Sequence, residues 1–178
     1  MNAKPFEKRI IPFSPPDVGE LEIAEVIDTL KSGWITTGPR TKQLEKNIAE
    51  WVGTEKCVCL NSQTACAEMA LRVMGIGEGD EVITCAYTYT ASASVIVHVG
   101  AKVVLIDTGK DSLEMDYEAL EKAINEKTKL VTIQRSKGYA TRPSFSVKQI
   151  GELIAFVKSV KPNIVCMVDN CYGEFVET

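Results

Sequence analysis

The chain has 178 residues, 45% of them hydrophobic, and a net charge of −4 that arises from 24 acidic and 20 basic side chains. This length and composition suffice to bury the core of one domain or a little more, and the interspersed charges argue against nucleic acid as a partner. The sequence shows no signal peptide with a charged segment followed by an apolar one, and no apolar run approaches the ~18 residues that span a bilayer. We therefore expect a soluble, cytoplasmic protein with no membrane partner.

The N-terminal part of the chain predicts an irregular arm followed by two helices. Residues 1–16 contain four prolines, which disfavour regular structure. From Asp17 the apolar residues follow helical spacing up to Gly33, a residue type that commonly ends helices. After a loop rich in turn-forming residues, Thr41 is placed to cap a second helix that ends at Gly53.

From residue 56 onward, apolar strands alternate with helical patterns. We predict strands at 56–61, 81–86, 101–107, 129–134 and 163–169, and helices at 64–74, 90–99, 116–126 and 147–160. Strands that are apolar on both faces and joined by crossover helices are typical of parallel sheets covered on both sides. The prediction is therefore an α/β fold, a single three-layer α/β/α domain over residues 17–178 with a mostly parallel sheet of about five strands.

The cysteines and the single histidine narrow the possible chemistry. Cysteines at positions 57, 59, 85 and 166 lie in or at the ends of apolar runs, and Cys66 lies in a helical pattern. Buried free thiols are therefore expected rather than disulfides. A zinc site or a histidine-dependent triad would need ligands beyond His98, so no metal site is predicted.

Ser62, Gln63 and Thr64 stand between a predicted strand and the start of a helix. Backbone N–H groups at a helix N-terminus lack intrahelical partners, and the helix dipole favours negative charge, so a phosphate group can bind there. The predicted donors are the Thr64 hydroxyl and the backbone amides of Gln63 to Ala65. The alternative is simple N-capping by Ser62 or Thr64.

Two further segments carry aromatic and acidic side chains to strand ends. Tyr87 and Tyr89 follow the strand 81–86, where an aromatic face can cover a planar ring or pack under the loop. Asp169 ends the last strand, where a carboxylate can hold the protonated nitrogen of pyridoxal 5′-phosphate (PLP), and Tyr172 can donate to the 3′-oxygen of that ring. An isolated aspartate could equally bind magnesium or cap a helix. Because the strand ends of an open α/β sheet share one crevice, the segments together predict a PLP pocket.

Residues from about 11 to 130 resemble the DegT/DnrJ/StrS family of PLP-dependent sugar aminotransferases. The matching stretches are SGWITTGPRTKQLEKNIAEWVG, NSQTACAEMAL and GDEVITCAYTYTASASVIVHVGAKVVLID. The resemblance implies a fold-type-I large domain, truncated here, in which Thr64 and Ala65 bind the phosphate, Tyr89 stacks on the ring and Asp169 holds the ring nitrogen. The family usually has glycine or alanine at the position of Gln63. The implied reaction transfers an amino group from glutamate to a nucleotide-linked keto sugar.

From about residue 131 the chain resembles a different branch of the same superfamily, the aluminium-resistance or methionine gamma-lyase-like proteins. The matching stretch is IQRSKGYATRPSFSVKQIGELIAFVKSVKPNIVCMVDNCYGEFVE. This second resemblance implies a chimera joined near residue 130, and it makes a carbon–sulfur lyase that acts on an amino acid an alternative function.

Both families also use a lysine beyond the aspartate to form a Schiff base with the cofactor, and we find no such lysine here. Lys137 is a conceivable substitute but is more simply an exposed lysine. A non-catalytic, recombined or engineered fragment is therefore a further alternative. The family sheet also has strands between the Asp169 strand and the first strand, so we expect either that the strand 56–61 pairs elsewhere or that another chain covers the open edges in a homo-oligomer.

Overall fold

The computed structural model describes residues 12, 15–136, 143–171 and 173 of the chain. Lys137, Tyr172 and most of the predicted N-terminal arm lie outside the described residues. By its internal contacts the chain divides into two compact units, residues 1–59 and residues 60–178. The domain predicted over residues 17–178 therefore includes parts of both units.

The first unit contains two helices, α1 (Glu20–Lys31) and α2 (Pro39–Val52). The second helix begins before Thr41, with Gly38 as its N-cap and Pro39 in its first turn. The predicted cap at Thr41 is therefore wrong, because the fixed φ of proline suits the first position of a helix. Gly53 ends α2 in the left-handed region, with a φ of 71°, as expected for a glycine at this position.

The turn between these helices is built around the side chain of Trp34. Its indole Nε1 donates a hydrogen bond to the Thr37 carbonyl at 3.0 Å. The indole lies so close to Gly38 that a Cβ atom there would stand 2.0 Å from Nε1. Any larger residue at this position would therefore have to displace the Trp34 ring. Beyond the turn, Arg40 Nη1 pairs with Glu25 Oε2 at 2.6 Å, which links the start of α2 to α1.

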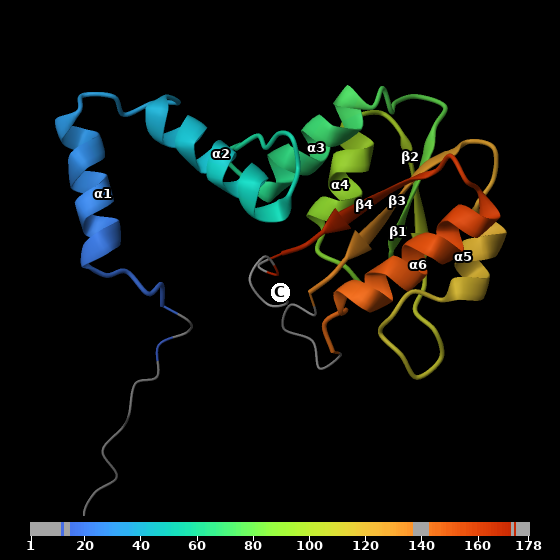
Figure 1. Cartoon of the computed structure of the whole chain (residues 1–178). Coiled ribbons are helices and arrows are strands. Elements are labelled where there is room, and N and C mark those ends of the chain that lie inside the picture. The colour runs from blue at the N-terminus through green and yellow to red at the C-terminus, as the bar shows by residue number, and fades with distance from the viewer. Residues whose placement is uncertain (1–11, 13–14, 137–142, 172, 174–178) are drawn as a thin grey trace, which may run out of the picture. The chain divides into compact units, whose positions relative to one another are not determined.

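The second unit is a parallel sheet with helices on both faces (Figure 1). Its strands are β1 (Glu81–Cys85), β2 (Lys102–Ile106), β3 (Thr128–Gln134) and β4 (Val165–Asp169), in the order β2-β1-β3-β4. The helices are α3 (Gln63–Val73), α4 (Ala91–His98), α5 (Tyr117–Ala123) and α6 (Val147–Val160). The predicted three-layer α/β/α fold with a parallel sheet is confirmed.

One predicted strand is not formed, so the described part of the chain holds a four-stranded sheet. Residues 56–61 have no strand partner in the structure. The backbone N–H of Cys59 donates to Glu45 Oε1 at 2.9 Å, so a side chain supplies the acceptor that a neighbouring strand would offer. Val58 is 68% exposed. The apolar pattern predicts a strand at 56–61, but without a partner strand for its backbone groups the segment remains irregular.

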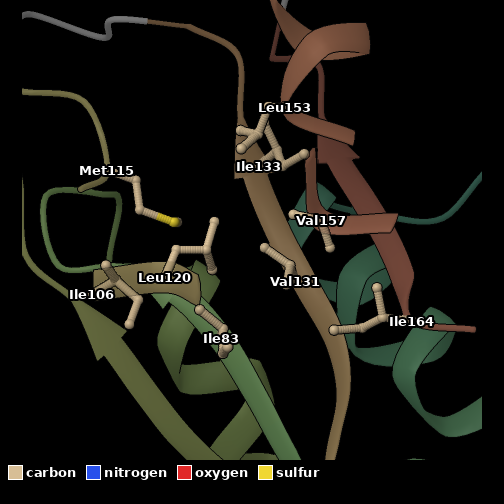
Figure 2. Packing of buried hydrophobic residues seen from close by; sticks show 9 residues of the cluster. All are labelled: Ile83, Ile106, Met115, Leu120, Val131, Ile133, Leu153, Val157 and Ile164. Atoms are coloured by element: carbon tan, nitrogen blue, oxygen red, sulfur yellow. The ribbon is translucent and has the colours of Figure 1, made fainter. Parts of the chain in front are cut away.

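The two faces of the sheet carry separate hydrophobic cores. Neighbouring residues of one strand serve opposite faces, since Val82 belongs to the α3–α4 core and Ile83 to the α5–α6 core. Figure 2 shows the second of these, in which β3 places Val131 and Ile133 against Leu153 and Val157 of α6. The first core is formed by Ala67, Leu71, Ile76, Val82, Val95, Ile96, Ala101 and Leu130. Burial of both faces is typical of parallel sheets, and all three strand pairs here are parallel.

The cysteines are free thiols, as predicted, but they are less buried than expected. Cys66 is exposed and the others are half-buried. In the part of the chain that the structure covers, no helix is both long enough and apolar enough to cross a membrane.

Candidate functional site

The start of α3 lies at the carboxyl edge of the sheet, where the phosphate site was predicted. Ser62 is the N-cap, and its Oγ accepts a hydrogen bond from the N–H of Ala65 at 3.1 Å. The capping role therefore belongs to Ser62. Within the described residues, the Thr64 hydroxyl and the first-turn N–H groups of Gln63 and Thr64 form no hydrogen bond. These groups leave the positive end of the helix dipole available to an anion.

Asp169 ends β4 and receives hydrogen bonds on both carboxylate oxygens. The Gln63 side-chain Nε2 donates to Oδ2 at 3.1 Å. On the other oxygen, Oδ1, the Cys171 backbone N–H donates at 3.2 Å and the Cys171 thiol lies at 3.1 Å. The acid and the start of α3, which are 106 residues apart in sequence, thus meet through one glutamine side chain.

The turn after β4 directs Cys171 back onto the acid. Its φ of 47° lies in the left-handed region, which is uncommon for residues other than glycine. This conformation allows its N–H to reach the side chain two residues earlier, as in an Asx turn. Burial, and next the hydrogen bond to Asp169, raise the pKa of the Cys171 thiol above its usual range. The thiol therefore stays protonated and acts as a donor at neutral pH.

Gln134 connects this turn to the loop after β1. It ends β3 and pairs with Asp169 in the sheet. Its Oε1 accepts a hydrogen bond from the Thr88 hydroxyl at 2.5 Å, and its Nε2 lies 3.9 Å from the Cys171 sulfur. Thr88 Oγ1 also lies 3.1 Å from Ser92 Oγ at the start of α4. Hydrogen bonds thus run along the strand ends from α3 to α4.

The predicted aromatic residues follow β1 at the same edge. Tyr87 is 46% exposed and Tyr89 is 71% exposed. Their neighbour Thr88 is held against the tip of β3, so Tyr89 lies on the loop that borders the strand ends. Among the residues that the structure describes, Tyr89 forms no hydrogen bond with Gln63 or Asp169, so its stacking role stays a prediction.

Arg135, directly after β3, ties the segments around Asp169 together. It is buried, with 6% of its surface exposed. Its Nε donates to the Phe145 carbonyl at 3.1 Å, while Nη1 donates to Asn170 Oδ1 and to the Gly173 carbonyl, both at 2.9 Å. A guanidinium in this position holds the turn after β4 against the segment that precedes α6.

On the α5–α6 side of the same edge is a small cavity of about 30 Å³, lined by residues that include Thr84, Thr132 and Gln134. On the polar side of the cavity, the Thr132 hydroxyl donates a hydrogen bond to Thr84 Oγ1 at 2.7 Å. A space of this size holds about one water molecule and not a cofactor ring.

The residues around Asp169 fit PLP in the kind of groups that they offer. The helix start provides donors suited to a phosphate, and Asp169 provides an acceptor suited to a protonated ring nitrogen. The two features meet through the side chain of Gln63, which begins the helix and donates to Asp169 Oδ2 at 3.1 Å. Tyr172, predicted to contact the ring, lies outside the described residues.

Sequence reasoning missed Thr88, Gln134, Arg135 and Cys171. Each of them is a polar or thiol side chain within a few residues of a strand end, which is the one signal that could have indicated them. The partners that these side chains select depend on which strands are neighbours. That information is absent from the local pattern.

The model of the DegT/DnrJ/EryC1/StrS aminotransferase family matches residues 16–141. Among similar curated proteins, the spore coat polysaccharide biosynthesis protein SpsC of Bacillus subtilis (strain 168) is 44% identical over 121 residues, which cover 68% of this chain and 31% of the relative. The UDP-4-amino-4-deoxy-L-arabinose–oxoglutarate aminotransferase of Shewanella sediminis is 42% identical over 126 residues, which cover 71% of this chain and 32% of that protein.

A similar solved structure is the PLP form of Spr1654 from Streptococcus pneumoniae. It is 47% identical, with a TM-score of 0.74 over 89% of this chain and 42% of that one. The same protein has also been solved in its pyridoxamine phosphate form. The chain spans about a third of the length of the curated relatives described above. The resemblance of the C-terminal part to methionine gamma-lyase-like proteins finds no support in these comparisons.

Proposed function

Because the chain belongs to the DegT/DnrJ/EryC1/StrS aminotransferase family, we propose that it supplies the cofactor-binding part of a PLP-dependent enzyme that transfers an amino group from glutamate to a nucleotide-linked keto sugar. The observation that carries this proposal is the hydrogen bond between Gln63 Nε2 and Asp169 Oδ2 at 3.1 Å. It brings the predicted phosphate site and the predicted ring-nitrogen acid to one place.

Each proposed residue has a distinct task. The Thr64 hydroxyl and the backbone amides of Gln63 to Ala65 hold the phosphate, because the start of α3 favours an anion. The Asp169 carboxylate accepts a hydrogen bond from the protonated ring nitrogen, and its negative charge keeps that nitrogen protonated. The Tyr89 ring covers the face of the cofactor. When bound, PLP supplies an electron sink for amino-group chemistry.

The names of the relatives support a sugar as the amino-group acceptor. SpsC is named for polysaccharide biosynthesis, and the Shewanella protein for an amino-sugar nucleotide and oxoglutarate. Glutamate is the amino donor that corresponds to oxoglutarate. For the substrate we therefore propose a nucleotide-linked keto sugar, with glutamate as the second small-molecule partner.

The proposal is tested first by cofactor binding. In isothermal titration of the full chain with PLP, Asp169→Asn is expected to weaken binding about ten- to a hundredfold, since a hydrogen bond to a charged group contributes roughly 1.5–3 kcal/mol. Asp107→Asn is a matched control, because Asp107 follows β2 at the same edge and its carboxylate contacts only the adjacent Thr108 N–H, at 2.8 Å, in the described structure. This control should bind PLP as the unmodified chain does.

Product assays then separate the candidate functions. Formation of 2-oxoglutarate from glutamate in the presence of PLP and a keto-sugar nucleotide would support the aminotransferase, whereas thiol release from methionine would point to the carbon–sulfur lyase. If the chain binds no PLP at all, the non-catalytic fragment is the correct description.

We further propose that the chain works as a homo-oligomer. Several apolar side chains of α1 are largely exposed within the first unit, among them Leu21 at 80% and Leu30 at 62%. Contiguous exposed apolar residues commonly mark surfaces that are covered by another protein. Light scattering coupled to size exclusion would show a mass of at least two chains, and a purely monomeric protein would contradict the proposal.

A further inference from the structure

Gln63 stands out because its side chain is directed to the acid and not to the helix that it begins. It is the first residue of α3, and its side chain is exposed. A glutamine at the start of a helix would ordinarily extend into solvent. Here its amide donates to Asp169 Oδ2 at 3.1 Å, across to the end of β4.

We propose that Gln63 is a positioning residue that fixes the orientation of the Asp169 carboxylate for the ring nitrogen of PLP. This inference rests on the proposed function, and it gives the Gln63 side chain a role different from a phosphate contact. The backbone amide of Gln63 keeps its predicted place at the phosphate.

The geometry explains how the positioning works. A free aspartate rotates about its terminal torsion, which is broad and roughly two-fold. Cys171 holds Oδ1 through its N–H and thiol, and Gln63 holds Oδ2. With donors fixed on both oxygens, the plane of the carboxylate is set. Within the described part of the chain, Oδ2 accepts only the Gln63 amide and retains a further lone pair, so the acid can still accept the ring N–H there.

The same bond couples the two ends of the pocket. Gln63 belongs to the helix start that receives the phosphate, while Asp169 receives the ring. The loss of the amide would therefore loosen the acid without removing any donor to the phosphate. That difference distinguishes a positioning residue from a phosphate ligand.

The contact itself is tested in the full chain without cofactor. In ¹H–¹⁵N NMR spectra, the Gln63 side-chain NH₂ signals are identified by their loss in Gln63→Ala. They are expected to shift in Asp169→Asn and to remain unchanged in Asp107→Asn. Unchanged Gln63 signals in Asp169→Asn would show that the bond does not form, which would overturn the inference, whereas the proposed function is tested separately by whether the chain binds PLP.

The role is tested by titration with two ligands, PLP and pyridoxal, which lacks the phosphate. Gln63→Ala is expected to weaken both ligands by the same factor, about three- to tenfold, as for loss of one hydrogen bond. In the Asp169→Asn background the same substitution should have little further effect. Thr64→Ala, which removes a phosphate donor, should weaken PLP alone. Gln43→Ala controls for loss of an exposed glutamine, since Gln43 bonds only to Asn47 on its own helix in the described structure.

Two results of the titration would also overturn the inference. A Gln63→Ala protein that loses affinity for PLP but not for pyridoxal would make Gln63 a phosphate contact. Full additivity with Asp169→Asn would show that the two side chains act independently. Absence of PLP binding by the unmodified chain is a different result, because it defeats the proposed function and the inference falls with it.

Discussion

At the scale of single residues, Glu81 shows how the amino ends of the strands are held, away from the proposed site. Its side chain is buried at the start of β1. Lys102 Nζ donates to Oε1 at 2.8 Å and Asn125 Nδ2 donates to Oε2 at 2.8 Å. These two hydrogen bonds, that of Lys102 first, lower the pKa of the Glu81 carboxyl below its ordinary value of 4.5.

The lowered pKa makes the stability contribution of Glu81 dependent on pH. A carboxyl whose pKa is lower in the folded state contributes fully above its unfolded-state pKa and loses that contribution as the pH falls toward its folded-state pKa. We expect Glu81→Gln to lower the free energy of unfolding by roughly 1–3 kcal/mol at pH 7, because a charged acceptor is lost. In urea titrations at several pH values, the difference from the unmodified chain should shrink below pH 4.5.

The matched control is Glu118→Gln. Glu118 is 87% exposed and lies 3.8 Å from Lys122 one turn along α5. An exposed pair of this kind contributes little, so this variant should match the unmodified chain at every pH. A Glu81→Gln difference that stays constant down to pH 3 would show that the ionised carboxylate is not what stabilises the fold.

At the scale of elements, the turn before α2 depends on contact between Trp34 and Gly38. A methyl group at Gly38 would lie 2.0 Å from the indole nitrogen, so Gly38→Ala must displace the ring and break its hydrogen bond to Thr37. We expect a changed Trp34 fluorescence spectrum and a loss of roughly 1–3 kcal/mol in stability, as for other overpacked sites.

The measurement is cleanest in a Trp51→Phe background, since the chain has two tryptophans. Gly53→Ala provides the comparison. Gly53 has φ 71° with no atom within 4 Å of an added Cβ, so its substitution strains the backbone without touching Trp34. If both variants left the Trp34 spectrum unchanged, the close packing of the indole on Gly38 would be incorrect.

The elements also show what the sequence could and could not predict. The predicted helix 147–160 matches α6, whose start is set locally by the capping box that Ser146 and Gln149 form in the structure. The strand 56–61 was wrong, since a strand exists only with a partner and an apolar run does not reveal one. The candidate site was likewise predictable only in part. Asp169 follows from its place at the end of an apolar strand, but its bond to Gln63 requires the fold that brings α3 to β4.

At the scale of the whole molecule, the second unit derives its stability from two cores that share one sheet. Leu71 of α3 and Leu120 of α5 are each fully buried, one in each core. Val82 and Ile83, adjacent in β1, connect the two cores through the same backbone. A substitution that destabilises the core on one face should therefore destabilise the whole sheet.

We expect Leu71→Ala and Leu120→Ala each to lower the free energy of unfolding by about 2–5 kcal/mol, through lost burial and the cavity left behind. Urea unfolding followed by far-UV circular dichroism should show the same single transition in both variants, moved to lower urea. Leu30→Ala, at a position 62% exposed in α1, should change stability by no more than about 0.5 kcal/mol. If the two core variants split the transition so that one part keeps its original midpoint, the two faces unfold independently, and the sheet does not join the cores into one cooperative unit.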